Sequence, residues 1–396
     1  MNEDKNKEQY INFDEYIRQG EPSRREAAYA WSTAIGLQAV DGLKTSEYLQ
    51  ETARKNIEGE ITIDEARELI KSYYKSKTKR EAEDNEMEEA DRVSANIVKV
   101  LSQPTFAFNA NGYISVHRRI FEGVFKHAGQ LRTYDITKKE WVLRGNTVNY
   151  LNWEDLRRAL EYDISQEVSF DHTQLSIEDF VRHICQFVSN LWQIHAFREG
   201  NTRATAVFTI QYLRSLGFSV DNDLFARHSW YFRNALVRAN YSNYQQKIVR
   251  DTSFLEKFFR NLLMGENNEL RNRYMLIDSP EWEDTSANAE QAPDKSPDKS
   301  PDKLPDKLPD KFSTDNEYVL RIVGLLGKEK LSIKELLQRA NLKDRESFMK
   351  LYVNPAIKEG FVSLLHPDKP RHPRQKYLLT VKGTLLFNAL LNSSKK

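Results

Sequence analysis

Apolar residues recur at helical spacing through the middle of the chain, and this pattern ends at a histidine. Between residues 177 and 194 an apolar side chain returns every three or four positions, which is the spacing of one face of an α-helix. A second helical pattern runs from Thr202 to Gly217, and a glycine at that place is typical of a helix C-terminus. The pattern therefore predicts two helices joined by a short loop, with His195 at the end of the first.

The N-terminal part of the chain predicts a small helical block over residues 23–77. Its helices are expected over 25–40, over 46–57 and after Thr62, where T-I-D-E forms a capping box with Glu65. An acidic stretch, REAEDNEMEEADR, then leads into a longer domain over residues 94–265.

The longer domain is expected to be helical apart from one segment. EWVLRGNTVNYL, from Glu140 to Leu151, has the composition of a strand region. Gly145 and Asn146 can supply the turn of a β-hairpin within it. We therefore predict a mainly α-helical domain that carries one exposed hairpin.

A proline-rich linker separates this domain from the C-terminal part of the chain. The linker is expected over residues 279–312, and within it the tetrapeptide PDKS or a close variant repeats from Pro293 to Phe312. A proline at every fourth position forbids both a continuous helix and a central strand. The tract is therefore interpreted as a solvated tether.

Residues 313–396 show the element order of a winged helix. The basic turn HPDKPRHPRQ would form the wing between two short strands. The expected helices and strands cover 318–326, 332–340, 345–359, 361–365 and 376–380, followed by a closing helix.

Charge is unevenly distributed along the chain of 396 residues. The totals nearly balance, with 59 Lys and Arg against 58 Asp and Glu, but residues 313–396 carry a net charge of +8 and the preceding residues −7. A basic excess of this size is compatible with DNA as a partner of the C-terminal domain, and equally with a protein partner.

Cysteine and hydropathy exclude several classes of protein. The single cysteine, Cys185, rules out a disulfide framework and a cysteine-based metal site. No run of about 18 apolar residues and no signal-peptide pattern occur, so we expect a cytoplasmic protein that does not enter the membrane.

The loop between the two central helices has the residues of a phosphate site. Free backbone N–H groups at a helix N-terminus favour an anion, Gly200 and Asn201 let it approach, and Arg203 can clamp it. Glu199 could hold a Mg²⁺ ion that bridges phosphate oxygens. A neutral His195 beside a Mg-nucleotide could deprotonate an incoming hydroxyl.

These residues also carry a resemblance. The segment HAFREGNTR, from His195 to Arg203, resembles the H-x-F-x-D/E-G-N-G-R-x-x-R signature of Fic-domain proteins, and the similarity extends over about residues 94–265. Such proteins typically transfer AMP from ATP to a hydroxyl side chain of a target protein. The resemblance implies a Fic helical bundle in which the hairpin at 140–151 is the flap that docks the target.

The resemblance also implies roles for single residues. His195 would be the general base, Phe197 a buried anchor, and Glu199 the Mg²⁺ ligand. The nucleotide would be bound by Gly200, Asn201, Thr202 and Arg203, with Asn240 at its base end.

Two positions depart from the family pattern. Thr202 replaces the third glycine of the motif, and Ala206 replaces its last arginine. In Doc-type relatives a lysine at the position of Thr202 accompanies transfer of the γ-phosphoryl group instead. The alternatives to an adenylyltransferase are therefore a Doc-type protein kinase and a catalytically inactive module that binds nucleic acid or protein.

The N-terminal block resembles the small VbhA-type antitoxins that inhibit Fic proteins. The similarity covers Ala34 to Ile70, and Asp41-Gly42 occupies the place of the Glu-Gly pair in the inhibitory motif S/T-x-x-x-E-G. Glu58-Gly59 aligns instead with a turn between helices. The resemblance implies an enzyme inhibited by its own N-terminal helices, with the Asp41 carboxylate near Arg203 and Asn201, whereas without it Asp41-Gly42 is simply a helix terminus.

Overall fold

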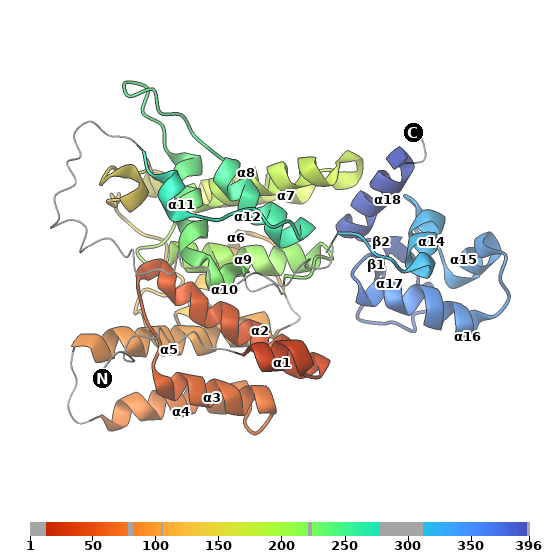
Figure 1. The fold of residues 1–396 in the computed structure, drawn as a ribbon, viewed down its shortest axis with the longest axis horizontal. Helices are drawn as coiled ribbons and strands as arrows, with labels where there is room; N and C mark the ends of the chain where they lie inside the picture. Colours follow the sequence, from red (N-terminus) through yellow and green to blue (C-terminus); the bar gives the residue numbers. More distant parts are fainter. Residues whose placement is uncertain (1–12, 78–81, 104–105, 221–223, 278–311, 394–396) are drawn as a thin grey trace, which may run out of the picture.

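The computed structural model describes residues 13–77, 82–103, 106–220, 224–277 and 312–393. These residues form an N-terminal helical group, a central helical domain and a C-terminal domain with a two-stranded sheet (Figure 1). The Pro-Asp-Lys linker predicted over 279–312 lies outside the described residues except for Phe312. Within the described ranges, no helix is both long enough and apolar enough to cross a membrane.

The N-terminal group contains the helices that its sequence pattern predicts. They are α1 (Asp14–Gln19), α2 (Pro22–Gly36), the 3-10 helix η1 (Leu37–Asp41), α3 (Glu47–Glu58), α4 (Ile63–Ser76) and α5 (Ala82–Leu101). The capping box is present, since Thr62 accepts a bond from the Glu65 N–H and the Glu65 carboxylate accepts one from the Thr62 N–H.

The acidic stretch belongs to a helix and is not a connection between domains. Its residues from Ala82 to Arg92 form the first half of α5, so the predicted boundary at residue 94 falls inside that helix. The buried Asp91 of α5 accepts hydrogen bonds from Ser46 and from the Tyr74 hydroxyl, which ties α3 and α4 to α5. Acidic residues with helical propensity can continue a helix as well as end one.

The central domain is built around two long helices. Its elements are α6 (Ala110–Ile120), η2 (Trp141–Leu143), η3 (Trp153–Asp155), α7 (Leu156–Ser169), η4 (His172–Gln174), α8 (Ile177–Ile194), α9 (Asn201–Ser215), α10 (Leu224–Arg227), α11 (Ser229–Asn240), α12 (Ser253–Met264) and η5 (Asn272–Met275). The pair α8 and α9 is the pair that the apolar pattern predicts. All residues of α9 from Asn201 to Leu213 are buried, so this helix lies at the centre of the domain.

The hairpin predicted over 140–151 does not form. This segment contains the 3-10 turn η2 and an extended stretch without strand pairing. Arg144 and Gly145 both have positive φ, and the Glu140 N–H donates to the Asn146 carbonyl at 2.9 Å, which closes a compact loop. The hairpin prediction was wrong because a glycine-asparagine pair favours a tight turn but does not ensure a ladder on both sides of it.

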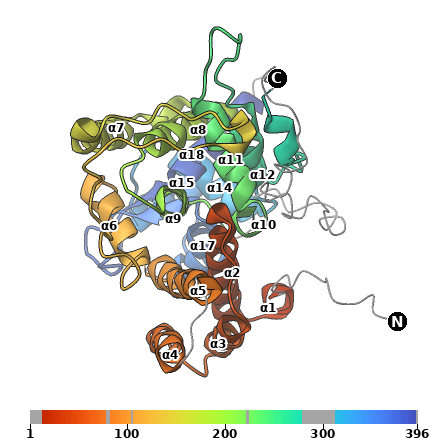
Figure 2. The ribbon, with the colours of Figure 1, turned by 90° about the vertical axis from the view of Figure 1, so that its left-hand side faces the viewer.

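The N-terminal helices pack directly on the central domain. Both ribbon views show α2 between α5 and α10, and contacts join α2 to each of them (Figures 1 and 2). A Cβ atom on Gly36 would lie 2.2 Å from the Ala226 carbonyl oxygen, and the Ser229 hydroxyl donates to the Gly36 carbonyl at 2.7 Å. The C-terminal end of α2 therefore packs closely against the central domain through its main chain. The 3-10 helix η1, which follows directly, is held close to the same domain.

The C-terminal domain has the predicted order of elements. They are α14 (Glu317–Leu326), α15 (Ile333–Ala340), α16 (Arg345–Phe348), a π-helical turn η6 (Met349–Val353), α17 (Asn354–Lys358), β1 (Val362–Leu364), β2 (Tyr377–Leu379) and α18 (Val381–Ser393). The strands pair antiparallel, with Val362 opposite Leu379 and Leu364 opposite Tyr377.

The C-terminal domain touches the central domain at a pair of glycines. A Cβ atom on Gly217 would lie 2.2 Å from the Gly360 carbonyl oxygen, and one on Gly360 would lie 2.1 Å from the Gly217 carbonyl oxygen. The Lys382 N–H donates to the Leu216 carbonyl, and the Asn388 side chain donates to carbonyls near η4. The domain therefore has a packed junction in addition to its covalent linker.

Candidate functional site

His195 ends α8 in a left-handed backbone conformation. Its φ and ψ are 49° and 56°, and its carbonyl accepts a hydrogen bond of 2.8 Å from the Arg132 Nε. A non-glycine residue with positive φ is held there by its surroundings. The conformation turns the chain out of α8 directly into the loop that starts α9.

The His195 imidazole is buried, neutral and without a hydrogen-bond partner among the described residues. The residue is 3% exposed, and neither ring nitrogen is bonded. Burial lowers the pKa of His195 well below its ordinary value, and the charges of Lys138, Arg233 and Arg132 lower it further. Such an imidazole can accept a proton at neutral pH, as a general base must.

Tyr150 covers this imidazole. The two ring centroids are 4.1 Å apart, and the Tyr150 hydroxyl donates to the Glu140 carboxylate at 3.0 Å. Glu140 is itself paired with Arg233 at 2.8 Å. The loop at 140–151 thus lies over the site, although it is not a hairpin, and Tyr150 is one of the groups that shield His195.

Asn201 closes the loop on itself. Its side-chain oxygen accepts the Phe197 N–H at 2.9 Å, and its side-chain nitrogen donates to the Phe197 carbonyl at 2.7 Å. The amide is therefore occupied within the loop. Any contribution of Asn201 to binding phosphate would come from its backbone N–H at the start of α9.

His117 of α6 packs against the loop and forms a hydrogen bond with it, a role that the sequence analysis missed. Its ring stacks on Phe197 with centroids 3.7 Å apart, its Nε2 lies 3.0 Å from the Glu199 carbonyl, and its Nδ1 accepts the Gly129 N–H. Burial lowers the pKa of His117 to about 3, so the ring is neutral and Nε2 carries the proton that it donates to Glu199. A lone histidine in an amphipathic helix gave no signal of this position.

Gly200 is required at the start of α9. It caps the helix with φ at 71°, and a Cβ atom there would lie 2.1 Å from Cζ of Phe121. Both the backbone conformation and the lack of space exclude a side chain. The glycine therefore fixes the path by which the loop enters the helix.

Glu199 lies directly before the glycine that caps α9. Its side chain is 58% exposed, and its carboxylate lies 3.8 Å from Nζ of Lys138. An accessible carboxylate beside a helix N-terminus suits Mg²⁺, which takes one or two carboxylates and completes its shell with water and phosphate oxygens. The residues present therefore fit a Mg²⁺ site, with Lys138 as a competing cation.

Arg203 is the most heavily paired residue of the site. It is 2% exposed, and its Nε lies 2.8 Å from Oδ2 of Asp41. The remaining nitrogens donate to Gln38 at 3.0 Å and to Glu89 at 2.9 Å, and the guanidinium lies 4.8 Å from the Phe121 ring centre. The contact expected between Asp41 and Arg203 is present, whereas Gln38 and Glu89 were not anticipated.

Gly42 ends η1 directly after Asp41. It adopts a left-handed conformation with φ at 74°, and its N–H donates to the Ala39 carbonyl. This turn stops η1 with the Asp41 carboxylate against the first turn of α9.

Thr202 and Ala206, the two residues that depart from the motif, both take part in packing inside the domain. The Thr202 hydroxyl accepts a bond of 2.9 Å from Nε1 of Trp192, which ties the start of α9 to the end of α8. Ala206 is fully buried. An arginine at residue 206 would therefore need space that the folded chain does not provide.

Asn240 is held by helix packing. Its side-chain nitrogen donates to the Ser189 carbonyl, the Ser189 hydroxyl and the Leu236 carbonyl. Its Oδ1 is buried without a hydrogen-bond partner among the described residues. These bonds join α11 to α8, and the nucleotide-binding role of Asn240 stays a prediction.

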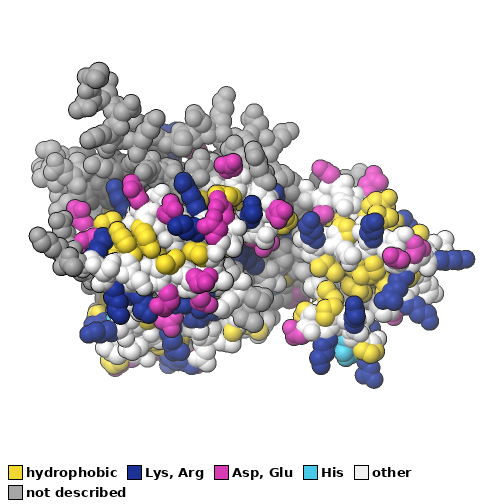
Figure 3. All heavy atoms as spheres, turned by 90° about the horizontal axis from the view of Figure 1, so that it is seen from below, with side chains coloured by type: hydrophobic (Ala, Val, Ile, Leu, Met, Phe, Trp, Pro, Cys, Tyr) yellow, Lys and Arg dark blue, Asp and Glu magenta, His cyan; other side chains and the backbone are white. Residues whose placement is uncertain are grey.

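The C-terminal domain does not present an uninterrupted basic surface on the face seen from below. Figure 3 shows a group of hydrophobic side chains there, with Lys and Arg around it and acidic side chains among them. The exposed large apolar residues of this domain include Tyr318, Leu342, Leu351 and Leu365. This face is as suited to a protein partner as to DNA.

Comparison with known protein families agrees with the geometry of the loop. Residues 107–213 match the Fic/DOC family. Residues 317–380 match a second family, described as the C-terminal domain of Fic-like proteins, where Fic stands for filamentation induced by cAMP. The matched segment therefore includes the whole loop from His195 to Arg203, and the second match lies within the C-terminal domain.

Two similar curated proteins carry the name protein adenylyltransferase. VbhT of Bartonella schoenbuchensis is 25% identical over 137 residues, which are 34% of this chain and 27% of that protein. A probable protein adenylyltransferase of Sinorhizobium fredii is 30% identical over 115 residues, 28% of this chain and 54% of that protein. The chain thus spans about a quarter of one relative and about half of the other.

Solved structures of Fic proteins are also similar to this fold. A Fic family protein from Desulfovibrio desulfuricans aligns with a TM-score of 0.40 and 16% identity, over 94% of this chain and 91% of that one. The N-terminal Fic domain of a Bartonella effector protein aligns with a TM-score of 0.33 and 19% identity, over 44% and 81% of the two chains.

Proposed function

We propose that this protein is a protein adenylyltransferase, which moves AMP from ATP to a hydroxyl side chain of a target protein. The observation that carries the proposal is the buried, unpartnered His195 imidazole directly before the loop that opens α9. The match of this segment to the Fic/DOC family, and the names of the similar proteins, support the same reaction.

The proposed reaction assigns a proton transfer to His195. The hydroxyl oxygen of the target attacks the α-phosphorus of ATP, and the bond from that phosphorus to the bridging oxygen breaks, so that pyrophosphate leaves. The hydroxyl proton passes to the neutral imidazole. Because His195 is held by Arg132 and Trp192 at its backbone, the ring keeps a fixed position relative to the loop.

The loop would hold the phosphates by its backbone. The N–H groups of the first turn of α9 carry the positive end of the helix dipole, and Gly200 leaves room for a phosphate to approach them. Glu199 would hold a Mg²⁺ ion, which supplies charge neutralisation for the phosphates. Arg203 would donate to phosphate oxygens once it is released from its present partners.

The contacts of Arg203 support inhibition by the N-terminal helices. Gln38 and Glu89 accept hydrogen bonds from the guanidinium, and the Asp41 carboxylate forms an ion pair with it. Asp41 and Gln38 both come from η1. A phosphate of ATP must compete with two carboxylates for one guanidinium. We therefore propose that η1, ended by Gly42, restrains the enzyme by engaging Arg203.

The decisive experiment uses ATP labelled at either the α or the γ phosphate with the purified full chain. Label transferred to protein from the α phosphate only supports adenylylation. Transfer from γ only would make the protein a kinase, and transfer from neither, in a variant with Asp41 and Glu89 both changed to Ala, would make it a binding module.

The control for this experiment is His195→Ala. It should abolish transfer while ATP binding survives, because the base acts on the target hydroxyl and not on the phosphates. His127→Ala, at a histidine outside the loop, should leave transfer unchanged. Transfer by His195→Ala within tenfold of the unchanged protein would remove His195 from the mechanism.

A further inference from the structure

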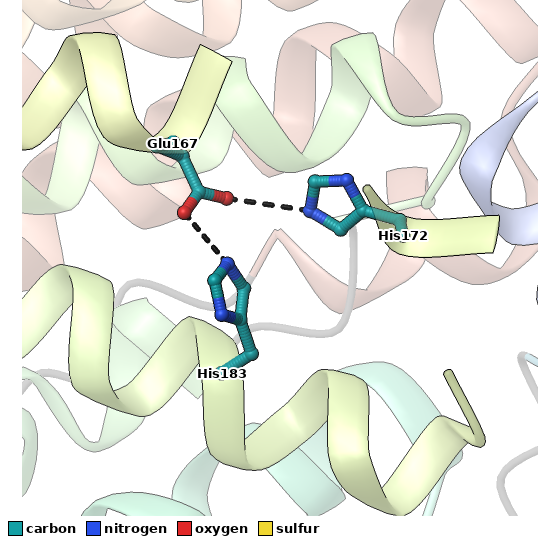
Figure 4. A group of neighbouring side chains, drawn as sticks. All are labelled: Glu167, His172 and His183. Carbon is teal, nitrogen blue, oxygen red and sulfur yellow. Dashed lines mark hydrogen bonds and ion pairs between the residues drawn. The ribbon is translucent and has the colours of Figure 1, made fainter. Parts of the chain in front are cut away.

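Two histidines and one glutamate converge where α7, η4 and the first part of α8 meet. Glu167 comes from the last turn of α7, His172 from η4 and His183 from α8 (Figure 4). His183 Nε2 lies 2.6 Å from one carboxylate oxygen of Glu167, and His172 Nε2 lies 3.4 Å from the other. One ligand atom from each residue can be chosen so that all lie within 4.8 Å of one another.

Glu167 is buried and the two histidines are partly buried. Glu167 is 4% exposed, and the side chains of His172 and His183 are 10% and 21% exposed. Burial by itself raises the pKa of Glu167, but its contacts with His172, His183 and the Tyr212 hydroxyl outweigh it and lower the pKa to about 2. The carboxylate is therefore ionised at neutral pH.

The hydrogen bonds within the cluster do not satisfy all of its members. His183 and Tyr212 each donate to the carboxylate, but His172 Nε2 is buried and makes no bond of acceptable geometry with any described residue. Buried polar atoms are normally paired, and an exception calls for an explanation. His172 Nε2 is directed toward Glu167, as the dashed line in Figure 4 indicates.

We propose that Glu167, His172 and His183 bind a divalent transition metal ion of the zinc class. Two imidazole nitrogens and a carboxylate oxygen are a donor set that zinc accepts, with a water molecule or the Tyr212 hydroxyl as the fourth ligand. Ligand atoms at about 2.0–2.2 Å from zinc lie roughly 3.4 Å from one another in a tetrahedron. The separation between His172 and Glu167 already has this value.

Binding requires only a small rearrangement. The direct hydrogen bond between His183 and Glu167 must open, and the widest separation in the cluster, at most 4.8 Å, must close by up to about 1.4 Å to reach the tetrahedral value. The metal would then replace a proton shared between His183 and Glu167, and it would also satisfy His172.

The position of the cluster gives the metal a structural role. It would join α7, η4 and α8, and η4 seats the C-terminal domain. Asn388 of α18 donates to the Thr173 carbonyl within this turn and to the Leu175 carbonyl directly after it, both at 3.0 Å. A metal bound through His172 would hold this turn in place and thereby the junction with the C-terminal domain.

The test measures zinc binding by the full chain without an affinity tag. Protein treated with EDTA and dialysed is titrated with ZnCl₂, and bound zinc is measured by mass spectrometry after gel filtration. We expect one equivalent of zinc per chain and an unfolding temperature that rises with zinc concentration. A chain that retains less than a tenth of an equivalent, and whose unfolding temperature does not change, overturns the proposal.

A matched pair of double variants locates the ion. His172→Ala with His183→Ala should lose zinc binding at least tenfold. The control is His366→Ala with His372→Ala, which makes the same change in composition at a histidine pair of the C-terminal domain whose ring centres are 4.2 Å apart. This control should retain zinc binding. The reverse result would place the ion in the wing and overturn the proposal.

A further measurement covers the case in which the first double variant does not fold. Co²⁺ replaces zinc in such sites, and a tetrahedral Co²⁺ ion absorbs visible light far more strongly than a hydrated one. The unchanged protein should show this absorption, and zinc should remove it by competition. Absence of the absorption at saturating Co²⁺ would contradict the proposed ligand set.

Discussion

Asp41 and Arg203 form an ion pair across 162 positions of the chain, with Oδ2 of one 2.8 Å from Nε of the other. Glu89 binds the same guanidinium from α5, and Gln38 binds it from η1. One arginine at the start of α9 thus joins the N-terminal helices to the proposed phosphate site. The pairing leads to the first prediction.

Asp41→Ala is expected to raise self-modification about tenfold, because a charge-assisted contact contributes about 1.5–3 kcal/mol and about 1.4 kcal/mol corresponds to a factor of ten. Adding Glu89→Ala should raise it further, since Arg203 then keeps only Gln38. The rate of label transfer from ATP measures both. Asp64→Ala, which removes an ion pair of α4 with Lys99, is the control, and no increase in the double variant would mean that η1 does not restrain the reaction.

Removing the Tyr150 ring should expose His195. Tyr150→Ala is expected to increase the rate at which diethyl pyrocarbonate modifies His195 at least severalfold, because this ring covers the imidazole at 4.1 Å. Tyr150→Phe keeps the ring and loses only the bond to Glu140, so its rate should stay close to that of the unchanged protein. Mass spectrometry of the modified peptide measures the rate, and equal rates in all three proteins would show that another group shields His195.

A methyl group at residue 200 should disrupt the loop. Gly200→Ala is expected to cost more than about 1–2 kcal/mol of stability, the cost of a left-handed conformation for an L-residue, with the overlap with Phe121 in addition. Urea unfolding measures the change. Gly324→Ala, in a helix where a Cβ meets no atom within 4 Å, should be neutral or stabilising.

The same position allows a double-mutant cycle. Phe121→Ala should recover part of the loss in Gly200→Ala, because it removes the overlap but not the backbone strain. Purely additive effects would show that Phe121 does not confine the loop.

His228 is expected to make the protein sensitive to acid. Burial, with a smaller effect of Arg227, lowers the pKa of His228 from 6.5 to about 4. Between these pH values the unfolded chain binds a proton that the folded chain does not, so stability falls as pH falls from 6.5 to 4. This proton lowers the free energy of unfolding by up to about 1.4 kcal/mol per pH unit. In His228→Phe the free energy of unfolding should therefore depend less steeply on pH, by up to that amount. Urea unfolding at pH 7.5, 6 and 5 measures the difference. Parallel curves for the two proteins would contradict the assignment.

Glu199 and Lys138 should have opposite effects on magnesium dependence. Glu199→Gln is expected to reduce label transfer to near background, because the carboxylate that would hold Mg²⁺ is lost. Lys138→Ala removes a competing cation 3.8 Å away, so half-maximal transfer should need less Mg²⁺. A titration of transfer against MgCl₂ measures both, and normal magnesium dependence in Glu199→Gln would place the ion elsewhere.

The sequence predicted the helices better than the contacts. The apolar spacing before His195 and the capping box at Thr62 depend on neighbouring residues only, and both were correct. The loop at 140–151 depends on η5 as well, since the Ile277 N–H donates to the Val142 carbonyl. A local pattern contains no information about a partner so distant in the chain.

In the site too, features that depend on neighbouring residues were predicted, and contacts with distant residues were mostly missed. The loop residues were recognised from their order, and the approach of Asp41 to Arg203 was anticipated from a resemblance. Glu89 and His117 were missed because each is one polar residue of an ordinary amphipathic helix until the fold brings it to the loop. Asn201 was predicted among the residues that bind the nucleotide, which stays a prediction, and the two bonds of its side chain to Phe197 could only be found in three dimensions.

The glycine pair at the domain junction bears on how a partner of the C-terminal domain could influence catalysis. Gly217 follows α9, the helix that begins at the loop, and its backbone meets that of Gly360 too closely for a methyl group on either residue. A ligand that tilts the C-terminal domain would therefore displace the C-terminal end of α9, because no side chain lies between the two main chains to absorb the movement. Since α9 is one continuous helix, the displacement would reach Arg203 and its partners at the other end.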